Sequence, residues 1–102
     1  MAKEIVWSLK AKSSFDSVIN YLEKNWTERE IRNFVQRTHL LLKLIASDKV
    51  RFRKSVKKNF HEVPVTKHNL LLYRINKDRI ELILFFDTRQ NPKKKKGYQS
   101  HH

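Results

Sequence analysis

The sequence predicts an α+β domain in which a helical hairpin packs on a mainly antiparallel four-stranded sheet, in the order β-α-α-β-β-β. Three observations predict this fold. Two helical apolar stripes follow one another directly, short β-type runs flank the pair, and the last two strands are joined by a short polar turn. Consecutive helices beside consecutive strands are typical of an α+β domain with short connections.

The first strand is expected over 3–7, where Ile5, Val6 and Trp7 have high β propensity, and Ser8 then suits a helix cap. The following apolar residues recur at offsets of 3, 4, 7 and 11. This spacing predicts one stripe of an amphipathic helix that ends near Asn25 or Trp26. The stripe consists of Phe15, Val18, Ile19, Leu22 and Trp26.

The second helix is expected to begin at a capping box over 27–30. In that motif the Thr27 hydroxyl accepts from the amide of Glu30, and the Glu30 side chain reaches back to the cap amide. Helical spacing then continues, and the abrupt restart favours two helices packed as a hairpin. The apolar face consists of Ile31, Phe34, Val35, Thr38, Leu41, Leu42 and Ile45.

The segment 47–59 is dense in positive charge and has no clear period, so we expect an irregular loop that Phe52 and Val56 attach to the core. A strand is expected over 60–66. Pro64 cannot donate to a ladder, which predicts that one side of this strand is unpaired or bulged.

The segment 67–92 is the strongest element of the sequence. Its two apolar runs flank the polar turn 76–78 and predict a β-hairpin. In 70–73 and 82–86 the side chains that point to either face of the strand are apolar, so we expect both faces of the sheet to be covered here. This predicts the centre of the sheet. Polar side chains at the strand ends can be presented to a ligand. They are Lys67, His68, Arg74, Asp87 and Arg89.

Length and composition predict one domain over 1–92 and a basic flexible tail over 93–102, whose last two histidines resemble a tag remnant. The chain has 102 residues and no Cys, which excludes disulfides and thiolate metal sites. No stretch approaches a membrane span and no signal peptide is visible, so a cytoplasmic location is expected.

The formal net charge of +13 lies mainly in the second half of the chain. Residues 1–46 hold 8 Lys and Arg against 5 Asp and Glu, whereas residues 47–102 hold 15 against 5. Such a field attracts nucleic acid, an anionic membrane surface or an acidic protein. Charge alone does not choose among these partners.

The element order, together with Ile5-Val6-Trp7-Ser8, Tyr73-Arg74-Ile75 and the passage from Ile80-Glu81-Leu82-Ile83 to Asp87-Thr88-Arg89-Gln90-Asn91-Pro92, resembles the RelE/ParE toxin superfamily. The resemblance covers most of residues 3–92. It implies the toxin of a bacterial type II toxin-antitoxin pair, neutralised by a cognate acidic antitoxin. The implied target is either mRNA on the ribosome, which a RelE-like enzyme cleaves, or DNA gyrase, which a ParE-like toxin poisons.

Metal-independent RNA cleavage needs a base, a proton donor and cations for the developing phosphate charge. His68 or His61 would serve as base or acid, Lys67, Arg74 and Arg89 as phosphate ligands, and Asp87 would orient a neighbour. The match is incomplete, because this chain has Asn69-Leu70 where many relatives carry an arginine. We expect no metal and no cofactor, since a glycine-rich phosphate loop and a histidine pair at ligand spacing are both missing from the sequence.

Structural interpretations stand beside these. His68 would be a strand-end histidine bonded to backbone, and Arg89 would pair with Asp87 or Glu81. The two tryptophans would be packing residues. If Arg89 and His68 are catalytic instead, replacing either by Ala should abolish toxicity and leave thermal stability nearly unchanged.

Basic side chains between the second helix and the next strand are candidates for binding an RNA backbone or an acidic antitoxin segment. These are Arg51, Arg53, Lys54, Lys57 and Lys58. A non-catalytic nucleic-acid-binding or degenerate member of the same fold is the alternative function.

Overall fold

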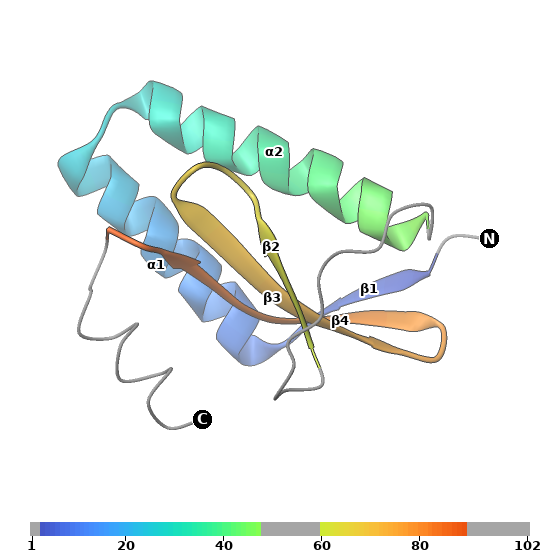
Figure 1. Cartoon of the computed structure of the whole chain (residues 1–102). Coiled ribbons are helices and arrows are strands. Elements are labelled where there is room, and N and C mark those ends of the chain that lie inside the picture. Colours follow the sequence, from blue (N-terminus) through green and yellow to red (C-terminus); the bar gives the residue numbers. More distant parts are fainter. Residues whose placement is uncertain (1–2, 48–59, 90–102) are drawn as a thin grey trace.

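The computed structural model describes residues 3–47 and 60–89 (Figure 1). Its elements follow the order β-α-α-β-β-β, which confirms the predicted fold. The strands are β1 (Glu4–Trp7), β2 (His61–Pro64), β3 (Asn69–Asn76) and β4 (Arg79–Asp87). The helices are α1 (Leu9–Asn25) and α2 (Glu28–Ala46).

The four strands form one sheet in the order β1-β4-β3-β2. The β2–β3 and β3–β4 pairs are antiparallel, whereas β1 runs parallel to β4. The hairpin of β3 and β4 therefore forms the centre of the sheet, as the sequence predicts. The short strand β2 lies at an edge, where the missing donor of Pro64 is tolerated, so this prediction is also confirmed.

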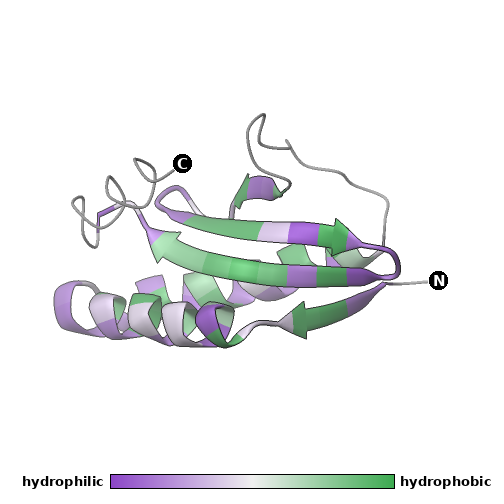
Figure 2. Ribbon diagram, turned by 90° about the horizontal axis from the view of Figure 1, so that it is seen from below, coloured by the Kyte–Doolittle hydropathy of each residue, from purple (hydrophilic) through white to green (hydrophobic). Residues whose placement is uncertain are grey.

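Both helices pack on the same face of the sheet, while the other face is turned away from them (Figures 1 and 2). Four aromatic rings from four elements meet between these layers. The Phe85 ring lies 5.3 Å from Trp7, 5.1 Å from Phe15 and 6.2 Å from Phe34, measured between centroids. Because these rings come from β1, α1, α2 and β4, they hold the two layers together.

The central strands are also buried on the side away from the helices. Leu72 and Leu84 are only 1% and 7% exposed, yet they lie outside the helix-side core. Figure 2 shows continuous hydrophobic colour through the middle of β4 and over the first half of β3. The prediction that both faces are covered is confirmed at these positions.

The cap residue of α1 and a serine within the helix satisfy the backbone of β4 where β1 ends. The last residue pair between β1 and β4 joins Trp7 to Leu82. Beyond it, the Ser8 hydroxyl donates to the Ile83 carbonyl at 3.3 Å and accepts from the amide of Ala11, which confirms Ser8 as the helix cap. The buried Ser14 hydroxyl then accepts from the amide of Phe85 at 2.9 Å.

Two sequence-based details are wrong. Thr27 occupies the cap position of α2, but its side chain makes no capping hydrogen bond; its carbonyl instead accepts from the Glu30 amide at 3.0 Å. The Glu30 carboxylate contributes to the charge around Arg89 instead. Val35 is 38% exposed rather than buried, because α2 buries a narrower stripe than its spacing suggests.

Further differences concern the ends of elements. The strand expected over 60–66 is shorter, since the chain turns back after Pro64 and the amide of Val65 donates to the Asn69 carbonyl at 2.7 Å. Trp26 follows the last turn of α1 and is 44% exposed, so it does not belong to the buried stripe.

The attachment of Phe52 and Val56 to the core and the basic tail over 93–102 lie outside the described residues. Neither of the two described helices is long and apolar enough to cross a membrane.

The Ser14 hydroxyl gives the first prediction. Ser14→Ala should lower the free energy of unfolding by about 1–3 kcal/mol, because the buried amide of Phe85 loses its acceptor. Ser13→Ala is the matched control, since the exposed Ser13 hydroxyl donates to the Lys10 carbonyl within its own helix. Urea unfolding followed by circular dichroism measures both variants. Equal stability of the two would contradict this role for Ser14.

Candidate functional site

A buried carboxylate lies at the end of β4. The Asp87 side chain is fully shielded from solvent and accepts four hydrogen bonds. Three come from Arg89: from its backbone amide at 2.8 Å, from Nε at 3.0 Å and from Nη2 at 2.8 Å. The fourth comes from Nδ2 of Asn69 at 2.7 Å. Both carboxylate oxygens are therefore engaged by donors.

Asn69 carries this network into the turn between β2 and β3. It stands opposite Asp87 in the β3–β4 register. Its side-chain oxygen accepts a short hydrogen bond from the Thr66 hydroxyl, which in turn accepts from the amides of His68 and Asn69 at 3.3 and 3.2 Å. The start of β3 and the end of β4 are thus fixed to each other by side chains as well as by the sheet.

Arg89 connects the same point to the helical hairpin. Its guanidinium carbon lies 4.3 Å above the centre of the Trp26 ring, and its side chain is 18% exposed. The stacked cation and the bidentate ion pair together fix the position of the guanidinium. We call Asp87, Arg89, Asn69 and Trp26 the β4-end cluster.

The charges in the β4-end cluster reinforce one another. Burial raises the pKa of Asp87. The hydrogen bonds from the side chain and amide of Arg89, the positive charge of Arg89 and the hydrogen bond from Asn69 lower it, and together they outweigh burial. The pKa of Asp87 therefore lies below its ordinary value. The hydrogen bond to Asp87 raises the pKa of Arg89, and the negative field of Glu30 adds to that effect. The carboxylate is therefore a permanently ionised partner at neutral pH rather than a proton acceptor.

The predicted site residues Lys67 and His68 lie at the same end of the sheet. The carbonyl of His68 accepts from the amide of Thr88 at 2.8 Å, which fixes it beside the β4-end cluster. Its side chain is half-buried, and Lys67 is exposed. These two are the predicted site residues at this end whose side chains remain open to a ligand.

Arg74 lies apart from the other predicted site residues. It is five positions along β3 from Asn69, which corresponds to about 17 Å in an extended strand. Its Nε bonds the Glu81 carboxylate on the neighbouring strand at 3.0 Å, in a solvent-exposed pair. The structure does not bring it together with His68 or Arg89. The other candidate base, His61, stacks on the buried ring of Tyr73 at 4.9 Å.

Sequence reasoning missed Asn69 and Trp26 as partners of the pair at 87 and 89, and Thr66 as the partner of Asn69. The proposed basic surface, formed by Arg51, Arg53, Lys54, Lys57 and Lys58, lies outside the described residues. In the part of the chain that is described, no group of three His, Asp or Glu residues is placed to hold a metal ion.

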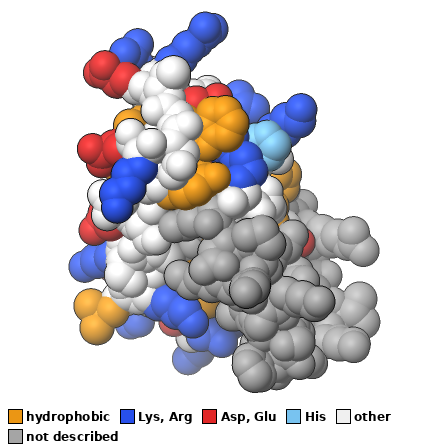
Figure 3. Space-filling view, turned by 90° about the vertical axis from the view of Figure 1, so that its left-hand side faces the viewer, with side chains coloured by type: hydrophobic (Ala, Val, Ile, Leu, Met, Phe, Trp, Pro, Cys, Tyr) orange, Lys and Arg blue, Asp and Glu red, His pale blue; other side chains and the backbone are white. Residues whose placement is uncertain are grey.

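Figure 3 shows the end of the molecule where α1 leads into α2, with hydrophobic, basic and histidine side chains in contact on its surface.

The chain has the RelE/ParE-like fold of the toxins of type II toxin-antitoxin systems. Among solved structures, it is similar to a chain of the chromosomal ParDE system from P. aeruginosa, with 12% identity, a TM-score of 0.69 and coverage of 84% of this chain and 96% of that one. It is also similar to a chain of the DinJ-YafQ toxin-antitoxin complex from E. coli, with 8% identity, a TM-score of 0.60 and coverage of 87% and 96%.

The YoeB dimer from Staphylococcus aureus gives 16% identity, a TM-score of 0.57 and coverage of 82% of this chain and 94% of that one. No protein-family model matches the chain, and no curated protein matches it by sequence. The comparisons therefore define the fold.

The β4-end cluster predicts a large loss of stability on substitution. Arg89→Ala should lower the free energy of unfolding by about 3 kcal/mol, because it leaves a buried carboxylate unpaired. This revises the sequence-based expectation of nearly unchanged stability. Arg74→Ala is the matched control and should cost at most about 1 kcal/mol, since its ion pair is exposed. Chemical unfolding of both variants measures the difference, and equal losses would contradict a buried structural role.

The lowered pKa of Asp87 predicts the direction of its pH dependence. A folded-state pKa below the unfolded value of about 3.9 gives stability that is fully present above that value and is lost as the pH falls through the folded pKa. Asp87→Asn should therefore be less stable than the wild type at pH 7 but lose less stability on acidification. Unfolding curves from neutral pH down to about pH 2 test this. Parallel losses in the two proteins would refute it.

Proposed function

We propose that this protein is the toxin of a type II toxin-antitoxin system, which arrests bacterial growth unless an acidic antitoxin binds it. The observation that carries the proposal is the shared fold, because the likeness extends over 94–97% of several toxin chains from such systems. The net charge of +13 supports an acidic partner. The proposed site of action is the cytoplasm.

We further propose that the toxin acts by binding its target, with DNA gyrase as the candidate, rather than by cleaving mRNA on the ribosome. RNA cleavage needs a cation that can contact the phosphate as negative charge develops on it, and a base that can accept a proton. Of the predicted catalytic groups, Arg89 is held by Asp87 and Trp26, Asp87 is saturated with donors, and Arg74 lies at the other end of the hairpin. Among them, Lys67 and His68 remain at the rim with open side chains, and they supply one cation and one base but no separate proton donor for the leaving oxygen.

Induced expression of the chain without an antitoxin should stop growth, and mapping of transcript ends in the arrested cells tests the mode of action. We expect intact transcripts together with induction of the DNA-damage response. Cuts phased to ribosomes, lost in His68→Ala, would establish the ribonuclease instead. Normal growth at verified soluble levels, with salt-sensitive binding of RNA or DNA, would favour the non-catalytic nucleic-acid-binding alternative.

A further inference from the structure

Trp26 is a large aromatic side chain that the fold leaves at the surface. It is 44% exposed, whereas the other tryptophan, Trp7, packs against the rings of Phe15 and Phe85. Among the described residues, none accepts a hydrogen bond from the indole N–H of Trp26. A tryptophan contributes a large apolar area when a partner covers it, and its N–H then needs an acceptor. The open indole therefore offers a ligand both an apolar surface and a donor.

Arg89 holds the exposed indole in place. Its guanidinium carbon lies 4.3 Å from the centre of the Trp26 ring, while Nε and Nη2 donate to the buried carboxylate of Asp87. The position of the indole is therefore fixed by the end of β4. A side chain that is fixed before binding loses little conformational entropy when a partner covers it. Trp and Arg are also enriched among the residues that dominate the binding energy of protein interfaces.

The charges around Trp26 cancel, although the chain as a whole is strongly basic. With histidine counted as neutral, the segments 23–30, 67–68 and 87–89 together contain four cations and four carboxylates. The cations are Lys24, Arg29, Lys67 and Arg89, and the carboxylates are Glu23, Glu28, Glu30 and Asp87. Nucleic acid and acidic proteins are attracted by an excess of positive charge. The core of a protein interface is instead depleted of charge and enriched in aromatic residues and Arg, which matches this surface.

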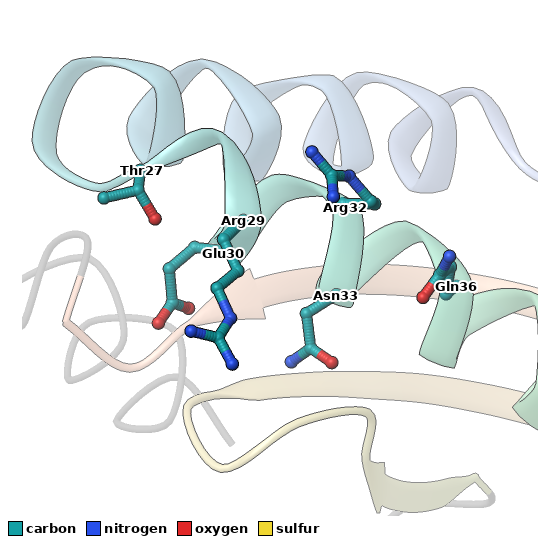
Figure 4. Close-up of a pocket in the computed structure, with 6 residues that line it drawn as sticks. All are labelled: Thr27, Arg29, Glu30, Arg32, Asn33 and Gln36. Atoms are coloured by element: carbon teal, nitrogen blue, oxygen red, sulfur yellow. The ribbon is translucent and has the colours of Figure 1, made fainter.

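A polar hollow begins at the residue after Trp26. It is lined by Thr27, Arg29, Glu30, Arg32, Asn33 and Gln36 (Figure 4). Figure 4 shows the charged ends of Arg29 and Glu30 directed to the same side of α2. Because Glu30 also acts on the charge of Arg89, which stacks on Trp26, the hollow and the indole adjoin. An apolar anchor with a polar rim is the arrangement found in protein interfaces.

We propose that Trp26, held by Arg89, is the anchor through which the toxin binds its target protein. The open part of the indole enters an apolar pocket of that protein, and an acceptor in the pocket takes the hydrogen bond from the indole N–H. A second copy of the chain is a poor occupant, because two chains of net charge +13 repel each other. The inference rests on the proposed function for the identity of the target, DNA gyrase. It goes beyond that function by assigning the anchor residue and the chemistry of the pocket.

Binding of the fluorescein-labelled full chain to purified DNA gyrase, followed by fluorescence anisotropy, tests the anchor. Trp26→Ala should weaken the dissociation constant about thirtyfold, as expected for a central tryptophan of an interface. Trp26→Phe keeps an apolar ring but lacks the N–H donor, so it should weaken the constant about fivefold. Leu9→Ala is the matched control, since it removes a side chain that is 85% exposed at the other end of α1. It should bind gyrase as the wild type does.

Trp26→Ala should remain folded, because Asp87 still holds Arg89, and urea unfolding verifies this. If it does not fold, Trp26→Phe decides the question. Binding of the folded variants equal to that of the wild type, or no binding by the wild type, would overturn the proposal. So would an equal weakening of binding to a labelled single-stranded DNA oligonucleotide, because the indole would then stack on bases. A wild-type dimer in solution that Trp26→Ala dissociates would also overturn it.

Growth assays separate this proposal from the proposed function. If the wild type is toxic, Trp26→Ala should lose the growth arrest but still co-purify with the co-expressed product of the adjacent gene. A Trp26→Ala variant as toxic as the wild type would refute the anchor and leave the toxin function standing. Loss of toxicity together with loss of co-purification would also refute an anchor dedicated to the target. A wild type without toxicity would refute the function itself.

Discussion

The packing of aromatic rings around Phe85 is the interaction on which the rest of the structure depends. Its neighbours Trp7, Phe15 and Phe34 come from the first strand and from both helices. Through this one ring, the helical hairpin acquires a fixed position on β4. That position in turn holds Trp26, at the end of α1, above the guanidinium of Arg89. Core and site are therefore parts of a single arrangement.

The buried carboxylate of Asp87 determines which side chains at this end of the sheet are available to a ligand. A charge taken out of water must be paired, and here the pairing uses the arginine that would otherwise be available to a phosphate. The cluster thus provides stability and order at the end of β4. Chemistry at this rim would have to come from side chains beside the cluster, such as His68 and Lys67, rather than from the cluster itself.

The sequence predicted the fold well because its periods are long and regular. Both helical stripes and both hairpin strands contain enough apolar residues to be recognised, and Ser8 was identified as a cap. The site was harder. Counting outward from the turn pairs Arg74 with Glu81 correctly, but it places Asn69 opposite Phe86. A register shift at Leu72 and Tyr73 moves its partner to Asp87, and nothing in the local sequence marks that bulge.

The parallel pairing of β1 with β4 also governs the order in which the chain can fold during synthesis. Residue 4 pairs with residue 79, so the first strand has no neighbour until the hairpin has left the ribosome. Contacts between such distant residues form late and slowly. The helices can form early, but Phe85 must emerge before they gain a sheet to cover. Synthesis from the first residue onward therefore delays completion of the sheet until the last strand emerges.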